Sequence, residues 1–275
     1  MKKYYFVLAT IAACLLSSCN ISERIIFNED MSGQYQSSFD MSTMMKLTNQ
    51  ASPPDVEKEN KVIDTVMVFS DILETYKDSI SALGKEERAK LEKLKGMTLQ
   101  MKMDEAAGIF EMNIKKDFSS FDQITFISND LNDLFDVAKT QGGAADGGSP
   151  ADQLMKADPV TYTFDGTVFR RVDIETLSEE DSSFNQKMID EQATPTQADA
   201  EIEGQLQQVM QQFTEIMEKS TMTLEYTFPR KIISVSNSQA TISNDGKTVT
   251  FAVDMQTLQE DKQLLKSFEV TLQNQ

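Results

Sequence analysis

The chain has 275 residues, with 26 basic and 44 acidic side chains, two cysteines, no histidine and no tryptophan. The absence of histidine removes the commonest general base and the commonest transition-metal ligand. A formal charge of −18 repels the phosphate backbone of nucleic acids. We therefore expect no nucleic-acid partner, no cofactor and no histidine-dependent catalytic site.

The first 18 residues have the layout of a secretory signal. Lys2 and Lys3 precede an apolar run over residues 4–16 that is broken only by Thr10. A transmembrane helix needs about 20 apolar residues, so this run is too short to span a bilayer. It ends in Leu16-Ser17-Ser18-Cys19, which resembles the lipobox of bacterial lipoproteins.

This resemblance implies that Cys19 receives lipid and that residues 1–18 are removed as a signal peptide. Two or more acyl chains give stable membrane anchoring. The mature chain would have 24 basic and 44 acidic residues, a formal charge of −20, so the lipid on Cys19 is the expected attachment to the membrane. By the retention rule of bacterial lipoproteins, Asn20 after the cysteine implies the outer membrane, facing the periplasm. Inner-membrane retention and surface display stay open as alternatives.

Residues 19–22 are predicted to form a lipidated tether, and residues 23–275 an α+β domain. Glu23–Asn28 and residues 35–41 read as a hairpin with a turn between them, followed by a short helix over residues 41–47. Residues 62–83 permit two interpretations. Apolar spacings of three and four favour a helix throughout, whereas the β-branched start favours a strand to Phe69 and a helix only from Ser70 or Asp71, which we prefer.

The middle of the chain predicts a charged helix, a hairpin and a second helix. The first helix covers Lys85–Lys95 and stops at Gly96. Alternating apolar residues predict strands over residues 97–103 and 110–114, and a helix is expected from Ser119 or Ser120 through Ala138. Residues 141–150, reading QGGAADGGSP, have the composition of a flexible linker, and whether they separate two domains stays open.

The last part of the chain is rich in strand signals. Asp165-Gly166 suits a type I′ turn in a hairpin over residues 162–172. A mobile loop is expected over 178–200 and an amphipathic helix over 199–219. Further strands are expected over residues 222–228, 240–242, 249–253 and 268–272. The rhythm of a hairpin followed by a helix predicts the α+β class, with an antiparallel sheet built from hairpins and helices packed on one face.

Two segments near the C-terminus resemble the C-terminal hairpin of LppM-type lipoprotein domains. They are Tyr226-Thr227-Phe228-Pro229 and Asn244-Asp245-Gly246-Lys247-Thr248-Val249-Thr250-Phe251. The resemblance covers about 50 residues. It implies an α+β lipoprotein domain that can handle amphiphiles.

No motif of the chain points to catalysis. No serine is followed three places later by lysine, and neither G-x-S-x-G nor a phosphate-binding glycine loop occurs. Asp104-Glu105 and Glu179-Glu180-Asp181 could hold calcium, but neither matches the EF-hand loop, and we expect no metal site. Met41, Met44 and Met45 could bind copper(I), although core filling is the favoured role of the methionines.

Two functional hypotheses follow for a non-enzymatic envelope lipoprotein. An apolar pocket enclosed by helices and a sheet, adaptable through its methionines, would bind an amphiphile. Alternatively, the domain is a structural or accessory subunit of an envelope protein complex. An enclosed cavity under the sheet would favour the first hypothesis and a solid core the second. Two facing carboxylates buried in a cleft would point to an enzyme.

Overall fold

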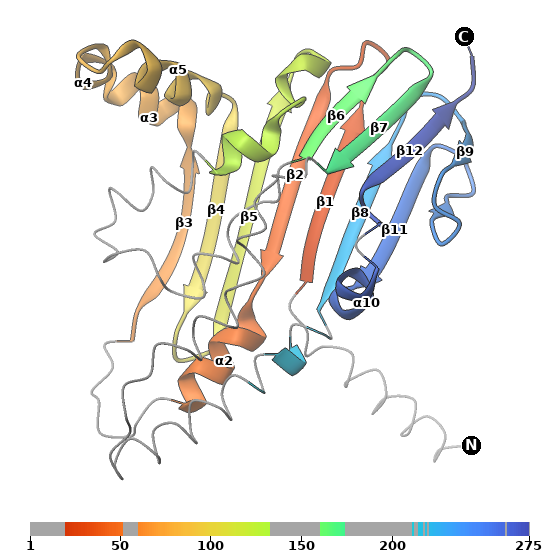
Figure 1. Cartoon of the computed structure of the whole chain (residues 1–275). Helices are drawn as coiled ribbons and strands as arrows, with labels where there is room; N and C mark the ends of the chain where they lie inside the picture. Colours follow the sequence, from red (N-terminus) through yellow and green to blue (C-terminus); the bar gives the residue numbers. More distant parts are fainter. Residues whose placement is uncertain are drawn as a thin grey trace, which may run out of the picture.

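Two β-sheets form most of the computed structural model of the chain, which describes residues 20–51, 60–132, 160–173, 211, 214–216, 218, 220–261 and 263–274. The larger sheet has eight strands in the order β10-β11-β8-β1-β2-β5-β4-β3 (Figure 1). Its strands are β1 (Asn20–Phe27), β2 (Gly33–Asp40), β3 (Val62–Val68), β4 (Met97–Asp104), β5 (Ile109–Phe118), β8 (Thr221–Thr227), β10 (Thr241–Ile242) and β11 (Thr248–Asp254).

A second sheet covers part of one face of the large sheet (Figure 1). Its order is β6-β7-β12-β9, and its strands are β6 (Val160–Phe164), β7 (Val168–Asp173), β9 (Ile232–Val235) and β12 (Ser267–Leu272). Phe169 of β7 and Phe268 of β12 lie against Tyr226 of β8, with ring centroids 5.0 and 5.9 Å apart. We call the covered face of the large sheet its inner face and the opposite face its outer face.

Strand β1 joins the two halves of the large sheet. It pairs with β2 in antiparallel fashion and with β8 in parallel fashion, so that Glu23 lies between Ser37 and Leu224. The other strand pairs of both sheets are antiparallel. The predicted α+β class is confirmed, and the parallel β1–β8 pair makes the large sheet mixed.

The described helices lie mainly near the ends of the strands (Figure 1). Helices α3 (Phe69–Thr75), α4 (Lys77–Ser81) and α5 (Lys85–Lys93) gather beyond one end of β3 and β4, whereas α2 (Ser42–Ala51) contacts β5 near the other end. The remaining helical segments are η1 (Phe121–Gln123), residues 127–132 and α10 (Met255–Glu260).

The predicted hairpins are confirmed because their signals are local. Strands β1 and β2, and strands β4 and β5, alternate as the sequence indicates. The preferred order of strand then helix in residues 62–83 is also correct, since β3 ends at Val68 and α3 follows at once. The helix begins at Phe69, earlier than the expected Ser70 or Asp71, and no side chain caps it. Gly96 has a φ of 83°, which only glycine adopts without strain, and separates α5 from β4.

The turn between β6 and β7 differs from the predicted type. Gly166 has a φ of 96°, but Asp165 has no positive φ, as a type I′ turn would need if Asp165 and Gly166 were its central pair. The Asp165 N–H donates to the carbonyl of Val168, so Gly166 and Thr167 are the central residues, and glycine at the first central position fits type II′. Hydrogen bonds from the Val168 and Thr167 N–H groups and from Arg170 lower the pKa of Asp165 to about 2.

Three other expectations need correction. Residues Asn20 to Ser22 belong to strand β1 rather than to a tether, because both β2 and β8 pair with them. Strand β9 and helix α10 were not predicted at all. The helix expected from Ser119 begins as the 3₁₀ helix η1 and is helical again over residues 127–132.

Some predicted segments lie outside the described residues. They are the linker over 141–150, the loop over 178–200, and most of the helix expected over 199–219. Within that last range, residues 211, 214–216 and 218 are helical.

Candidate functional site

The predicted lipid attachment lies next to the first residue of the large sheet. Cys19 itself is outside the described residues, but Asn20 already belongs to β1 and is paired with Asp40 of β2 and Thr221 of β8. We call this end of the strands the Asn20 end and the opposite end, where β1 turns into β2, the far end. A lipid on Cys19 would therefore hold the Asn20 end at the bilayer.

Aromatic side chains fill the space between the two sheets. The ring of Phe27 lies 5.3 Å from that of Phe228 and 5.5 Å from that of Phe169, measured between centroids. Phe169, Phe228 and Phe268 are buried to 1% exposure or less. The space between the sheets is therefore a solid core over β1, β8 and β11.

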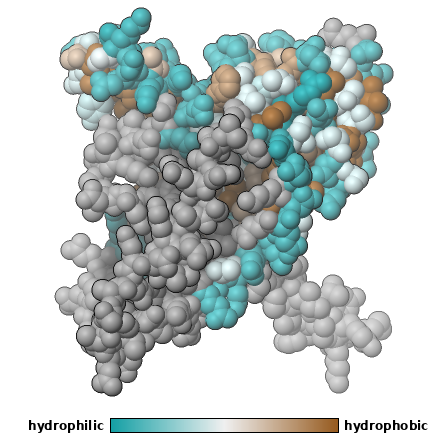
Figure 2. All heavy atoms as spheres, viewed as in Figure 1, coloured by the Kyte–Doolittle hydropathy of each residue, from teal (hydrophilic) through white to brown (hydrophobic). Residues whose placement is uncertain are grey.

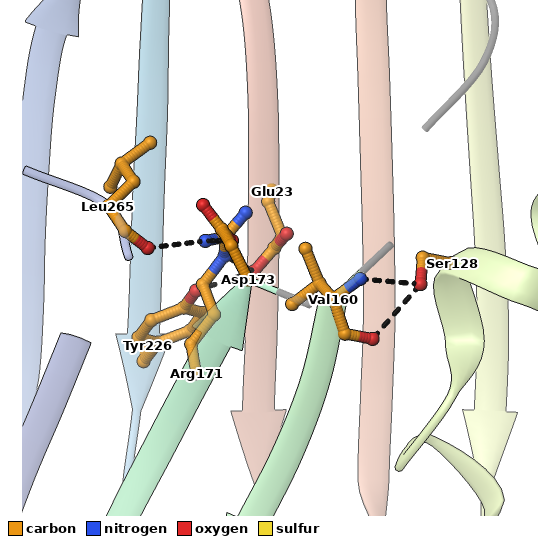
Figure 3. Close-up of polar contacts among 7 residues, drawn as sticks. All are labelled: Glu23, Ser128, Val160, Arg171, Asp173, Tyr226 and Leu265. Atoms are coloured by element: carbon orange, nitrogen blue, oxygen red, sulfur yellow. Dashed lines mark hydrogen bonds and ion pairs between the residues drawn. The ribbon is translucent and has the colours of Figure 1, made fainter. Parts of the chain in front are cut away.

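A charged group is buried inside this core. Glu23 of β1 is 7% exposed and Arg171 of β7 is 3% exposed. The Tyr226 hydroxyl donates to Glu23 Oε1 at 2.5 Å, and Arg171 Nε lies 3.7 Å from the same oxygen. Arg171 also donates to Asp173 and to the carbonyl oxygen of Leu265, as Figure 3 shows. We call Glu23, Arg171, Asp173 and Tyr226 the buried cluster.

The surroundings of the buried cluster shift its proton equilibria. Burial, reinforced by the negative charge of Glu23, raises the pKa of Tyr226 and of Tyr162 well above the usual value. Burial is the largest single influence on Arg171 and alone would lower its pKa, but the charges of Glu23, Tyr226, Tyr162 and Asp173 together outweigh burial and the pKa is raised. The tyrosines thus stay neutral and the guanidinium stays charged. Because these tyrosines and Arg171 neither gain nor lose a proton near neutral pH, they suit non-covalent contacts that hold the two sheets together better than acid–base chemistry.

Sequence reasoning missed the buried cluster although β1 carries a signal for it. Glu23 has the same parity as Ile25 and Phe27, so the period of two in a strand places it on the inner face. A charge at an inward position of an otherwise apolar strand indicates a buried partner. The identity of that partner, Arg171, could not be read because the two residues belong to different sheets.

A second buried ion pair lies at the far end. Lys116 of β5 is 5% exposed, and its Nζ lies 2.9 Å from Asp130 Oδ2 and donates to the carbonyl oxygen of Lys93 at 3.2 Å. Lys93 Nζ lies 3.8 Å from the other carboxylate oxygen of Asp130. These residues line a surface hollow of about 770 Å³ beside Phe118 and Phe126. Two of its three lysines, Lys93 and Lys116, are thus already paired with a carboxylate.

Inner-face side chains become more exposed toward the Asn20 end. In β4, Met97 and Leu99 are 0% and 3% exposed, whereas Met101 and Met103 are only half-buried. Strands β1, β2, β5 and β8 show the same change along their length. The half-buried residues near this end form what we call the apolar belt: Ile21, Phe39, Ile63, Met101, Met103, Phe110 and Met222.

Cross-strand pairing makes the apolar belt continuous. Ile21 is opposite Phe39 and Met222, and Met103 is opposite Phe110 and Ile63. Met112 is buried at 2% and links Phe39 of β2 to Met101 of β4. In Figure 2 an apolar area is visible beside the second sheet, where that sheet no longer covers the large one. Because methionine is unbranched and polarizable, such a surface can adapt to ligands of different shape.

The structure places the other candidate residues in structural roles. Asp104 Oδ1 accepts from the Ala107 N–H and Glu105 Oε2 from the Lys61 N–H, so this acidic pair organises the β4–β5 turn. In the described part of the chain no group of three or more histidine, cysteine, aspartate or glutamate residues could hold a metal ion. Met97 and Met112 fill the core as predicted. Met41, Met44 and Met45 lie at the start of α2, half-buried, and Glu179-Glu180-Asp181 fall outside the described residues.

Comparison with known proteins identifies no family for the chain. No model of a protein family matches it, and no curated protein matches it. The folded domain of the LppM protein of Mycobacterium tuberculosis, solved by NMR, resembles it with a TM-score of 0.38 and 7% identity over 93% of this chain and 90% of that one. That domain is of the type that the C-terminal segments resemble, but at this level of similarity nothing about the site or function follows from it. Among the described residues, no helix is both long and apolar enough to cross a bilayer.

We predict that Tyr226→Phe lowers the free energy of unfolding at neutral pH by about 1–2 kcal/mol, because Glu23 loses a donor in a buried site. Tyr76→Phe is the matched control: Tyr76 is 58% exposed, and its substitution should change stability by less than about 0.5 kcal/mol. Urea unfolding of both variants measures the difference.

The effect of Tyr226→Phe should also depend on pH. The pKa of Tyr226 is raised above its unfolded value of about 10, so its contribution is complete below that pH and is lost as the pH rises through the folded pKa. The gap between the wild-type protein and Tyr226→Phe should therefore narrow in alkaline solution. Equal stability of Tyr226→Phe and Tyr76→Phe at neutral pH would contradict the assigned hydrogen bond.

Proposed function

We propose that the protein is a lipid-anchored, non-enzymatic lipoprotein of the cell envelope, attached through Cys19 to the outer membrane and facing the periplasm. The lipobox-like Leu16-Ser17-Ser18-Cys19 supports the anchor, and Asn20 supports the choice of membrane. The structure adds a constraint on orientation. Since strand β1 begins at Asn20, no flexible spacer separates the lipidated residue from the large sheet.

This attachment gives the domain a defined orientation relative to the membrane. A strand advances about 3.3 Å per residue, so the eight residues of β1 place the far end about 25 Å beyond the Asn20 end. The apolar belt lies at the Asn20 end, next to the bilayer, and the solid aromatic core begins beyond it. An acyl chain leaving the bilayer would meet the belt without crossing much water.

The function best supported by this arrangement is binding of an amphiphile on the apolar belt. The observation that carries it is the change from buried to half-buried inner-face residues toward the Asn20 end in five neighbouring strands. Folding normally closes a core on all sides, because each exposed Å² of apolar surface gives up about 25 cal/mol of stabilisation. A belt of methionines left half-open is a surface suited to a further apolar partner.

We predict that Cys19→Ser releases the protein from the membrane fraction, because serine cannot take up the thioether-linked lipid. Cys14→Ser provides a matched control, since it makes the same substitution inside the apolar run, where the thiol is expected to act only as a small hydrophobe. Fractionation of cells producing each full-length variant gives the result. Persistent membrane association of Cys19→Ser would contradict the anchor, and recovery of the wild-type protein with the inner membrane would contradict the membrane assignment.

We predict that the double variant Met101→Gln, Met103→Gln weakens binding of a dansyl-labelled fatty acid to the full-length chain about tenfold. Glutamine keeps the length of the side chain but removes apolar surface worth about 1–2 kcal/mol. Val66→Gln is the control, because Val66 is 57% exposed on the outer face of neighbouring β3. Native mass spectrometry of the wild-type protein should show a co-purified amphiphile. Equal weakening in the control, or repeated absence of any bound amphiphile, would argue against this function.

The accessory-subunit hypothesis has its own supporting observation. Strand β3 is the edge of the large sheet, and its outer face exposes Val62 at 61%, Val66 at 57% and Val68 at 36%. An edge strand with exposed apolar side chains is a surface on which another protein can add a strand. The solid core between the sheets is the outcome that favours this hypothesis over an enclosed pocket, so amphiphile binding is proposed only for the apolar belt outside that core.

We predict that a photo-crosslinking residue at Val66 captures a specific envelope protein in intact cells if the accessory role holds. The same residue at Ile242 is the control, since Ile242 is 43% exposed on β10, the opposite edge of the sheet. Val68→Lys should abolish capture at Val66, because a charge at the edge prevents strand addition. Capture of the same proteins from both edges would contradict a specific docking surface.

A further inference from the structure

A second hollow, of about 660 Å³, lies at the far end, where the ends of the two sheets meet. Glu29 and Met31 of the β1–β2 turn form one wall, and residues of the β6–β7 turn, including Gly166, form another. The segment Pro229-Arg230-Lys231, Lys247 and the last described residues after β12 complete it. We call it the cationic hollow, because it contains three basic side chains and one acidic side chain.

Backbone hydrogen bonds fix the walls of the cationic hollow. The Phe228 N–H donates to the carbonyl of Lys247 at 2.9 Å, and the Ile232 N–H donates to that of Gly246 at 2.7 Å. The Gln273 N–H donates to the carbonyl of Lys231 at 2.8 Å. Lys231 and Lys247 are thus held on adjoining, mutually bonded segments. The cations are brought together by the fold rather than by chance encounters of mobile loops.

Arg230 is held in one orientation. Its two terminal nitrogens donate to the carbonyl oxygens of Gln273 at 3.1 Å and Gly166 at 2.5 Å, and its guanidinium lies over the ring of Phe164 at 5.8 Å from the centroid. Carbonyl oxygens and an aromatic face orient the guanidinium without cancelling its charge. Three of the five guanidinium N–H donors stay available.

The cations of this hollow are not in ion-pair contact with a carboxylate, although the charge of Lys247 adds to the hydrogen bond from Ser243 in lowering the pKa of Asp245. No ion pair joins Arg230, Lys231 or Lys247 to an acidic residue in the described structure. Asp245, the acidic residue nearest in sequence to Lys247, accepts instead from the Ser243 hydroxyl and the Lys247 N–H within its turn. The hollow beside Lys116 differs, because Asp130 pairs with two of its three lysines and four further acidic residues line it. Three cations outside ion pairs, gathered in one hollow that has a single acidic lining residue, favour an anionic ligand.

We propose that the cationic hollow binds a phosphate-bearing ligand. A guanidinium fork and two ammonium groups match the several oxygens and the charge of a phosphate better than those of a single carboxylate. Met31 and Phe164 give the organic part of the ligand an apolar surface beside the phosphate. The hollow opens at the far end, away from the apolar belt, and this inference does not depend on amphiphile binding there.

Two sources could supply this phosphate, a soluble phosphate ester or the headgroup of a lipid in a facing membrane. Full-length protein in phosphatidylcholine nanodiscs distinguishes them, because its own anchor is then already inserted. The first measurement titrates glycerol 3-phosphate by calorimetry at low salt. The second tests flotation of the nanodiscs with vesicles of phosphatidylglycerol or of phosphatidylcholine. Saturable binding of the ester, or flotation with phosphatidylglycerol vesicles alone, would support the proposal and identify the source.

The double variant Lys231→Ala, Lys247→Ala should weaken binding about a hundredfold, about tenfold for each charge-assisted hydrogen bond lost. Both lysines are exposed, so the unfolding midpoint should not change. Lys102→Ala, Lys115→Ala is the matched control, because it removes two exposed lysines from the outer face of β4 and β5. Equal weakening in both double variants, or no binding of either probe to the wild-type protein, would overturn the proposal.

Discussion

The parallel pairing of β1 with β8 is the constraint on which the rest of the structure depends. It joins the first described strand to one about two hundred positions later, as the separation of 203 between Glu23 and Tyr226 shows. Without it, β8, β10 and β11 would not extend the sheet built from β1 to β5, and the second sheet would lack most of its aromatic support. Such non-local pairing is entropically costly and forms slowly. It therefore needs side-chain contacts that stabilise the strand pair only in its correct register.

The buried cluster supplies contacts of this kind. A one-residue slip of β1 against β8 would move Glu23 to the outer face and leave Arg171 buried beside no carboxylate of β1. Buried ion pairs often contribute little net stability relative to apolar residues, but loss of one partner is strongly unfavourable. We therefore interpret the ion pair of Glu23 and Arg171 as the contact that fixes the register of β1 and the position of β7 over the large sheet. The aromatic rings around them provide the bulk of the burial, which is non-directional and could not set the register alone.

The sequence predicts the parts of this fold that local patterns determine. Alternation in β4 and β5, the helix start after Val68 and the stop at Gly96 depend on neighbours within a few residues. Strand β9 was missed because its four residues have no local partner and pair only with β12. The parallel β1–β8 pair was missed for the same reason, whereas the strand at Asn20 pairs both with β8 and with the nearby β2. For the candidate sites, the alternation of methionines placed Met101 and Met103 on the apolar face but predicted core filling rather than a half-open belt. The convergence of Arg230, Lys231 and Lys247 required the backbone bonds among three separate segments.

The two ends of the strands differ in chemistry, and a lipid on Cys19 would turn this difference into a direction. Had a tether of many residues preceded β1, the domain could tumble and either end could approach the bilayer. Because Asn20 is already paired on both sides, a lipid on Cys19 would leave only the bonds of that residue and its lipid between the bilayer and the large sheet. The apolar belt would then face the source of acyl chains, and the cationic hollow would face away from the anchoring membrane, with the length of β1 between them. A phosphate-bearing partner and an acyl chain could thus be held at once without competing for one surface, which a freely tumbling domain could not ensure.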